Sequence, residues 1–175
     1  MSEKEFKVAI MMGSGSDLDV MLEAAKMLKQ FGVSYDVEVT SAHRSPARTR
    51  DYVKRAEEGG VKVFIVGAGA AAHLAGVVAA ESTLPVIGVP LSGSALNGVD
   101  ALYSTVMMPG GIPVASMAIG KAGATNAGLF AVEILATSDP ALGSKLRDYK
   151  ATLARKVEEA SQEAKRRAFP ADEPA

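Results

Sequence analysis

The 175-residue sequence contains no cysteine and no tryptophan, and it has no long hydrophobic run. Without cysteine the chain cannot form disulfides or thiolate metal sites, so nothing indicates an oxidising compartment. No stretch approaches the roughly 18 consecutive apolar residues of a membrane span, and the first six residues carry three charges instead of an apolar signal core. We therefore expect a cytoplasmic protein that is neither exported nor inserted in a membrane.

An excess of charge of either sign is also missing. The chain has 19 Lys and Arg against 20 Asp and Glu, with a formal net charge of -1. This balance gives no electrostatic footprint for a nucleic-acid backbone, so we expect a small-molecule substrate. Aromatic residues make up only 5%, whereas alanine, glycine and valine abound, which indicates close packing of helices on a sheet. The length suits one domain spanning residues 1–175.

Short apolar runs alternate five times with segments of helical periodicity. The predicted strands are residues 6–12, 35–40, 61–66, 86–89 and 114–119. The predicted helices are residues 17–32, 45–60, 74–82, 99–106 and 122–135. In the second helix Ser45 is the expected N-cap and Pro46 the first-turn proline. Five β-α units in succession predict a three-layer α/β fold, with a doubly wound parallel sheet between two layers of helices.

A change of composition after Thr137 separates this core, about residues 6–137, from a final helix predicted at about residues 139–167. Its apolar stripe consists of Leu142, Leu146, Tyr149, Leu153 and Val157. Such a stripe usually lies on the helix's own domain. This helix, however, follows a completed sheet and is about as long as the domain is wide, so packing on neighbouring subunits is the other interpretation. Residues 168–175, rich in proline and acid, are expected to form a flexible tail.

The chemistry is expected in the loops that follow the first three strands, because ligands of open parallel sheets bind at the carboxyl ends of the strands. These loops are residues 13–17, 41–46 and 67–73, and both histidines of the chain lie on them. If the strand order is 2-1-3-4-5, the three loops are neighbours. Residues far apart in the sequence would then form one site.

The first loop combines flexible glycines with two hydroxyls, Ser14 and Ser16, ahead of a helix N-terminus that favours an anion. The two serines are equally typical of a simple turn. Asp17 is either the N-cap of the helix or an acceptor for ribose hydroxyls, and the two roles are compatible.

The second loop places His43 and Arg44 in a turn. A guanidinium binds phosphate through a planar fork of donors, and an imidazole can both give and take a proton near neutral pH. A solvated surface arginine and a structural histidine are the alternatives. The pattern favours a phosphorylated substrate and acid-base chemistry at His43.

The third loop is nearly all glycine and alanine, so it exposes backbone donors and could enclose something small. Its Gly67-x-Gly69-x-x-Ala72 pattern matches a dinucleotide fingerprint, but it follows the third strand and no acid occurs at residues 87–90. Gly120-Lys121 lacks the rest of a P-loop, so ATP is not indicated. The spacing of the histidines and Asp17 matches no metal-ligand pattern.

The three loops together resemble the N5-carboxyaminoimidazole ribonucleotide mutases of purine biosynthesis. The likeness rests on residues 12–17, 41–44 and 67–74, and it continues through residues 85–90, 98–104, 108–114 and 118–127. It covers roughly residues 6–137 in order. The resemblance implies an isomerase with a flavodoxin-like fold, strand order 2-1-3-4-5, assembled as a homo-octamer that needs no cofactor and no metal.

The resemblance also implies a role for each matching residue. Ser14, Asp17 and Arg44 would bind the ribonucleotide, with help from Ser16 and Ser41, and His43 would carry the proton. The part of the site that holds the base and the carboxylate of the substrate would be lined by the remaining predicted site residues, which are Gly69, Ala70, His73 and Leu74.

The sequence departs from the family pattern at three alanines, Ala70, Ala75 and Ala115, where glycine, proline and glycine are usual. A methyl group at residue 70 would narrow the carboxylate pocket. Two other interpretations stay open. One is the animal-type carboxylase that uses free carbon dioxide, although that enzyme usually has lysine where this chain has Arg44. The other is a non-catalytic flavin- or nucleotide-binding module on the same fold.

Overall fold

Five parallel strands form one sheet in the order β2-β1-β3-β4-β5, which confirms the doubly wound fold and its predicted strand order. The computed structural model describes residues 6–169. The strands are β1 (Val8–Met12), β2 (Tyr35–Val39), β3 (Val63–Gly69), β4 (Val86–Leu91) and β5 (Ala115–Ser116). Contacts group the chain into two units, residues 1–135 and 136–175, and the whole sheet belongs to the first.

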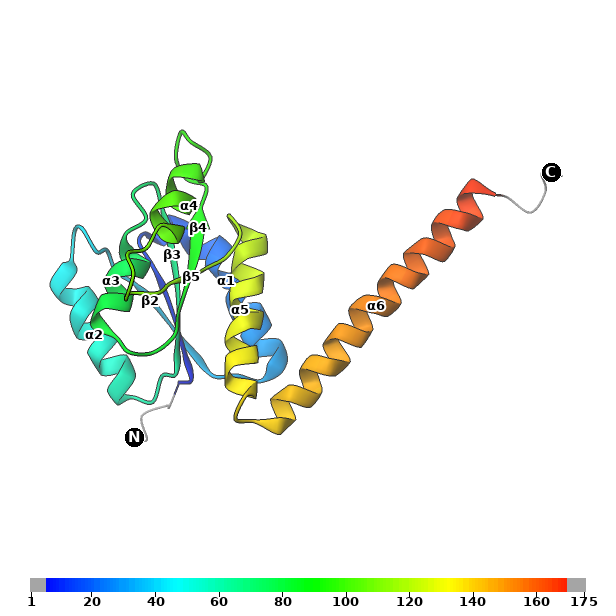
Figure 1. Cartoon of the computed structure of the whole chain (residues 1–175), viewed down its shortest axis with the longest axis horizontal. Helices are drawn as coiled ribbons and strands as arrows, with labels where there is room; N and C mark the ends of the chain where they lie inside the picture. Colours follow the sequence, from blue (N-terminus) through cyan, green and yellow to red (C-terminus); the bar gives the residue numbers. More distant parts are fainter. Residues whose placement is uncertain (1–5, 170–175) are drawn as a thin grey trace. The chain divides into compact units, whose positions relative to one another are not determined.

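Helices cover both faces of the sheet (Figure 1). A short 3-10 turn, η1 (Gly15–Asp17), leads into α1 (Leu18–Phe31), which shares one face with α5 (Lys121–Ala136). The other face carries α2 (Pro46–Glu58), α3 (Leu74–Glu81) and α4 (Val99–Val106). Burial on two faces explains why β1 and β4 are apolar throughout rather than alternating.

Small residues allow the helices to approach the sheet closely. A Cβ added to Gly67 of β3 would lie 2.4 Å from Sδ of Met21, and one added to Gly88 of β4 would lie 2.4 Å from Cγ2 of Thr105. A side chain at residue 67 would displace the Met21 side chain of α1, and one at residue 88 would push α4 away from the strand. The abundance of glycine and alanine therefore reflects packing distance, as the composition predicts.

Several predicted boundaries were wrong: the larger shifts are in strands, whereas the helix limits differ by at most two residues. β3 continues to Gly69 and β4 to Leu91, because Gly69 pairs with Leu91 at the end of their shared ladder. β3 is paired on both sides only as far as Gly67, which lies opposite Met12 of β1, and beyond it the ladder with β4 alone continues the strand. The fifth strand is reduced to two residues, Ala115 and Ser116, which pair with Ile87 and Gly88 of β4.

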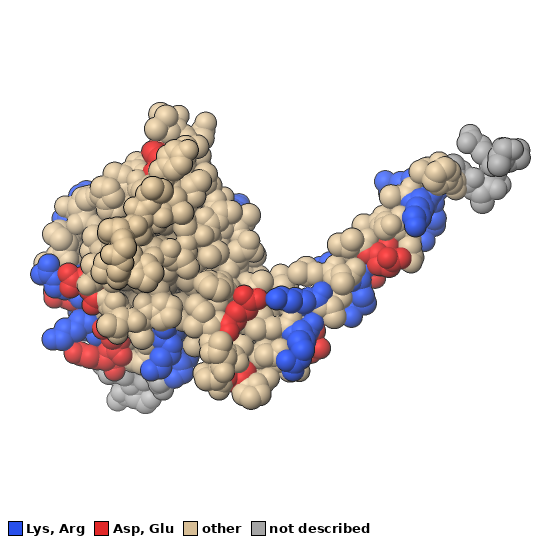
Figure 2. Space-filling view, viewed as in Figure 1, with Lys and Arg blue, Asp and Glu red and all other residues tan. Residues whose placement is uncertain are grey.

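The second unit contains α6 (Pro140–Ala168), which confirms the final helix. The Asp139 carboxylate accepts hydrogen bonds from the backbone N–H groups of Ala141 and Leu142, at 2.9 and 3.2 Å, and so caps the first turn. Most of the helix is exposed, and Figure 2 shows charged side chains along it. Packing on neighbouring subunits stays a prediction. Most of the predicted flexible tail lies outside the described residues.

No helix within residues 6–169 combines the length and the apolar character needed to cross a membrane.

Candidate active site

The loops after β1, β2 and β3 meet around a cavity of about 260 Å3 at the carboxyl ends of the strands. Its lining includes nine of the ten predicted site residues, namely Ser14, Ser16, Asp17, Ser41, His43, Arg44, Gly69, Ala70 and Leu74. The tenth, His73, contacts His43 instead. Strand order alone brings these loops together, because β1 lies between β2 and β3.

The first loop presents two linked hydroxyls and a carboxylate. Ser14 caps η1, since its Oγ accepts from the backbone N–H of Ser16 at 3.3 Å, and the Ser16 hydroxyl donates to the same Oγ at 2.9 Å. Asp17 stands at the N-cap position of α1, but its side chain makes no capping hydrogen bond. Of the two roles predicted for Asp17, the side chain therefore does not perform the first, capping the helix. The carboxylate remains available to a ligand.

Burial in the cavity raises the pKa of Asp17, and hydrogen bonds from the Ser14 backbone and the Ser16 side chain oppose that rise without cancelling it. A carboxylate that is partly desolvated gains more from a new donor than one in water does. Asp17 is accordingly suited to accept hydrogen bonds from the hydroxyls of a bound sugar.

The second loop is held by hydroxyl groups. Ser45 occupies the N-cap position of α2 ahead of Pro46, as predicted, but its side chain makes no capping hydrogen bond. Its Oγ instead donates to the Ser41 carbonyl at 3.2 Å and accepts from the Ser41 N–H at 3.1 Å. The Ser41 hydroxyl accepts from the Arg44 N–H at 3.2 Å. Beneath them Thr40 and Thr49, both buried, share a 2.8 Å hydrogen bond. These bonds fix the turn that carries His43.

Arg44 ties the second loop to the first. Its Nη2 donates to the Gly13 carbonyl at 3.1 Å, and the rest of the guanidinium stays exposed at the cavity. Because one nitrogen of the guanidinium is already hydrogen-bonded, the Arg44 side chain loses less entropy when it binds an anion. Arg44 is thus positioned as a phosphate ligand beside Ser14 and Asp17.

His43 and His73 form a hydrogen-bonded pair. His43 Nε2 lies 2.8 Å from His73 Nδ1, and the two rings meet edge to face, with centroids 4.9 Å apart and an interplanar angle of 88°. One nitrogen must donate and the other accept, so the bond fixes which tautomers are compatible. The remaining nitrogen of His43 is left for a ligand.

The third loop delivers His73 to the start of α3. Two tight turns, from Ala72 N–H to the Ala70 carbonyl at 2.9 Å and from His73 N–H to the Ala71 carbonyl at 2.8 Å, compress the chain there. Ala70 takes a left-handed conformation, φ 51°, that favours glycine. The loop adds only methyl groups and backbone to the cavity wall.

Sequence reasoning missed Gly93, which follows β4 and also lines the cavity. The rule that selected the first three loops applies equally to the fourth strand, so the signal was present. Among residues 6–169 no group of three His, Asp or Glu side chains could hold a metal ion.

Comparison with known proteins decides the family. The sequence matches the family described as AIR carboxylase over residues 7–156. The chain belongs to this family. A member from Pyrococcus horikoshii, named N5-carboxyaminoimidazole ribonucleotide mutase, is 54% identical over 158 residues, 90% of this chain and 88% of the relative. Family members of the same name from Thermotoga maritima and Escherichia coli are 51% and 52% identical, covering 89% and 82% of this chain and 90% and 85% of the relatives.

Solved structures of the family show the same fold. Treponema denticola PurE superimposes with a TM-score of 0.82 at 29% identity, over 91% of this chain and 98% of that one. A PurE2 variant from the same organism gives a TM-score of 0.85 at 29% identity, over 93% of this chain and all of the other. The resemblance seen in the three loops is therefore confirmed for the family and the fold.

Proposed function

We propose that this protein is an isomerase that converts N5-carboxyaminoimidazole ribonucleotide to 4-carboxy-5-aminoimidazole ribonucleotide in purine biosynthesis. Relatives that share half of its residues over most of both chains carry the mutase name. The observation that carries the proposal is the His43–His73 pair, in which His43 lines a small cavity together with Arg44 and Asp17. Those groups fit a phosphorylated ribose beside a proton carrier.

The reaction moves one carboxyl group and one proton. Protonated His43 donates to the exocyclic nitrogen of the substrate carbamate, and the nitrogen–carbon bond breaks to release carbon dioxide. Ring carbon 4 of the aminoimidazole then attacks the carbon dioxide, forming a carbon–carbon bond. His43, now neutral, removes the proton from carbon 4 and the ring recovers its aromaticity. The imidazole ends as it began.

His73 has a positioning role in this proposal. If its Nδ1 accepts from His43 Nε2–H, as the 2.8 Å separation permits, that proton stays on Nε2 through the cycle. Only the proton on the other nitrogen of His43 then moves. The pair therefore keeps one tautomer of neutral His43 ready to act as the base.

Binding is assigned to the groups around the pair. Arg44 would hold the phosphate, Asp17 would accept from the ribose hydroxyls, and Ser14 would support both, with Ser16 and Ser41 holding the loops. The carbon dioxide would be retained against Gly69, Ala70, His73 and Leu74, of which all but His73 line the cavity. Retention makes recapture effectively intramolecular.

A homo-octamer in the cytoplasm belongs to the same proposal. Five large apolar side chains on and beside α4 are exposed in a single chain, namely Leu96, Val99, Tyr103, Val106 and Met107. Figure 2 shows few charged side chains over this region. Patches of this kind mark subunit contacts. Light scattering should give about eight times the chain mass of 18.1 kDa, and a stable monomer would contradict the assembly.

The activity is tested with the purified protein and the carbamate ribonucleotide, without ATP and with carbon dioxide purged from the buffer. We expect the carbon-carboxylated isomer to accumulate at an unchanged rate after purging. Dependence on added carbon dioxide with aminoimidazole ribonucleotide as substrate would identify a carboxylase instead. A flavin-bound protein without turnover would identify a binding module.

A further inference from the structure

One hydroxyl group, that of Ser45, closes the turn that carries His43. Ser45 Oγ donates to the Ser41 carbonyl at 3.2 Å and accepts from the Ser41 N–H at 3.1 Å, beside the backbone bond of 2.9 Å between the same two residues. Both side-chain bonds lie at or beyond the long end of the usual range for their kind. A small displacement of Ser45 Oγ would therefore break them.

Thr40, which follows β2, places a second hydroxyl beside Ser45. Thr40 Oγ1 lies 2.8 Å from Thr49 Oγ1 and 3.4 Å from Ser45 Oγ, and the second distance is too long for a strong hydrogen bond. Because Thr40 is only 3% exposed, its hydroxyl cannot turn to water and needs an acceptor in the protein. The choice of that acceptor decides where Ser45 Oγ can lie.

The count of hydroxyl protons makes Thr49 the acceptor. Each hydroxyl carries one proton. The Thr49 hydroxyl donates to the Ser45 carbonyl at 3.2 Å, so Thr40 must be the donor in the 2.8 Å bond between the two threonines. Ser45 uses its own proton on Ser41. The hydrogen bonds thus run in one direction, and every proton has its own acceptor.

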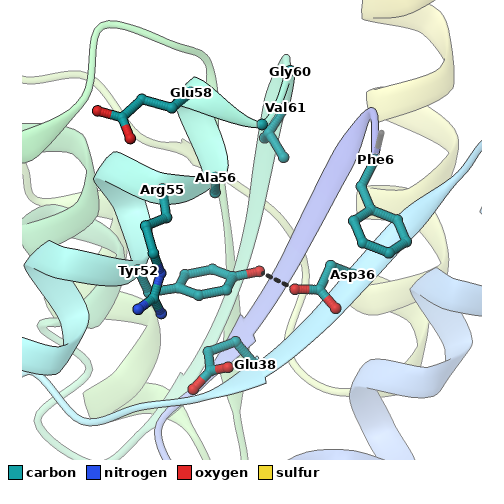
Figure 3. A pocket seen from close by; sticks show the side chains of 10 residues that line it. Phe6, Asp36, Glu38, Tyr52, Arg55, Ala56, Glu58, Gly60 and Val61 are labelled. Carbon is teal, nitrogen blue, oxygen red and sulfur yellow. Dashed lines mark hydrogen bonds between the residues drawn. The ribbon is translucent and has the colours of Figure 1, made fainter. Parts of the chain in front are cut away.

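Thr49 is a fixed point because α2 is anchored on β2. Thr49, Tyr52 and Val53 form the buried face of the helix. The Tyr52 hydroxyl donates to Asp36 Oδ2 of β2 at 2.9 Å, as Figure 3 shows beside a larger cavity of about 680 Å3 at the other end of the strands. Burial raises the pKa of Tyr52, so the phenol stays protonated and keeps donating. The helix, and not the turn, therefore sets the place of Thr49.

We propose that Thr49 is a positioning residue for His43. By accepting from Thr40, it keeps the Thr40 hydroxyl away from Ser45, and Ser45 can then hold the turn. Without the Thr49 hydroxyl, the acceptor within reach of Thr40 is Ser45 Oγ, and their 3.4 Å separation would shorten toward about 2.8 Å. That movement would draw Ser45 off its two long bonds and release the turn.

Release of the turn would reach the reaction through His43. The 2.8 Å bond from His43 Nε2 to His73 Nδ1 joins two loops, so it is lost when one of them moves. Substrate affinity should change less than turnover, because Arg44 is also held at the Gly13 carbonyl. This catalytic consequence rests on the proposed isomerase function, whereas the placement of the turn does not.

The placement of the turn can be read directly, since the chain has only two histidines. In NMR spectra of labelled imidazole groups, Thr49→Val should shift and broaden the His43 resonances. Thr40→Val removes the donor itself and should leave them in place. The control is Thr105→Val on α4, a buried threonine that donates to the Ala101 carbonyl at 2.7 Å. Identical His43 resonances for Thr49→Val and Thr105→Val would overturn the proposal.

Turnover gives the second reading. We expect kcat of Thr49→Val to fall about tenfold, with KM changed by less than about threefold. Thr49→Ser keeps the hydroxyl and should recover most of the loss. Thr40→Val combined with Thr49→Val should recover it too, because the misdirected hydroxyl is gone. A double variant as slow as Thr49→Val would overturn the proposal.

Ser45→Ala keeps the test decisive if Thr49→Val folds poorly. Ser45 is half-buried, and its loss removes both side-chain bonds to Ser41, so this variant should show the same fall in kcat and the same change at His43. Normal turnover with normal His43 resonances would overturn the proposal. If the unmodified chain itself fails to isomerise the carbamate, the proposed function is wrong, and the histidine resonances still test the role of Thr49.

Discussion

Ala70 is a residue in a conformation better suited to glycine. Its left-handed backbone costs an L-residue roughly 1 to 2 kcal/mol, while glycine gives back about 0.4 to 1 kcal/mol through the unfolded chain. We expect Ala70→Gly to raise the free energy of unfolding by about 0.5 to 1 kcal/mol in urea titrations. Ala71→Gly, beside it, should lower that free energy. Equal losses for both variants would show that residue 70 is not strained.

Asp17 illustrates a conflict between stability and function. Burial raises the pKa of its carboxyl in the folded state, so the native chain binds a proton more tightly than the unfolded chain does. Stability contributed by this group is present at acid pH and is lost as pH rises through the raised pKa. At pH 7 Asp17→Asn should therefore raise the thermal midpoint, and the difference from the unmodified chain should vanish below the pKa of the unfolded chain.

The same substitution should weaken substrate binding. Loss of a charge-assisted hydrogen bond of about 1.5 to 3 kcal/mol predicts a ten- to hundredfold higher KM. Asp19→Asn, a neighbouring exposed carboxylate, serves as the control. An unchanged KM for Asp17→Asn would remove this residue from the binding site.

His73 should act through the proton on His43. His73→Phe removes the 2.8 Å hydrogen bond, so we expect kcat to fall on the order of tenfold, with KM changed far less and with the acid limb of the pH profile displaced. His73→Gln, which keeps an acceptor, should recover much of the loss. A rise in KM alone, with the pH profile unmoved, would give His73 a binding role instead.

At the scale of elements, the approach of α4 to β4 depends on Gly88. A methyl group there would lie 2.4 Å from Thr105 Cγ2 and 2.9 Å from Val114 Cγ1, both on β-branched side chains that cannot turn aside. Gly88→Ala should lower the free energy of unfolding by about 1 to 3 kcal/mol in a chemical denaturation curve. Gly110→Ala, with nothing within 4 Å, is the matched control. Equal losses of unfolding free energy for Gly88→Ala and Gly110→Ala would show that α4 can move away from β4 at no cost.

The elements also show where sequence patterns suffice. Residues 99–106 were predicted as a helix and form α4 with the same limits, because Gly98 precedes the helix and Pro109 follows it closely. The third strand was predicted to stop at Val66, yet β3 continues to Gly69. Local propensity favours an end at the glycines, whereas pairing with β1 up to Gly67 and with β4 up to Gly69 decides the outcome, and both neighbours are remote in the sequence.

For the whole molecule, alternating apolar runs and glycine-rich turns are local signals, so they predicted the α/β class and the three loops of the site, whereas the strand order was implied by the resemblance to the family. The sequence also placed both histidines at one edge of the sheet. It could not predict their hydrogen bond, since residues 30 positions apart are joined only by the packing of the loops. The larger cavity lined by Phe6, Asp36, Tyr52 and Glu58 was missed for the same reason, because these residues meet only through the fold.

The most direct measurement for the whole account is ATP-free conversion of the carbamate ribonucleotide by His43→Asn, alongside the unmodified chain, with substrate affinity measured separately. An amide of similar size can fill the site but cannot carry the proton. The account predicts that kcat falls by at least about 10²-fold while affinity changes only a few-fold. Near-normal turnover by His43→Asn would contradict it.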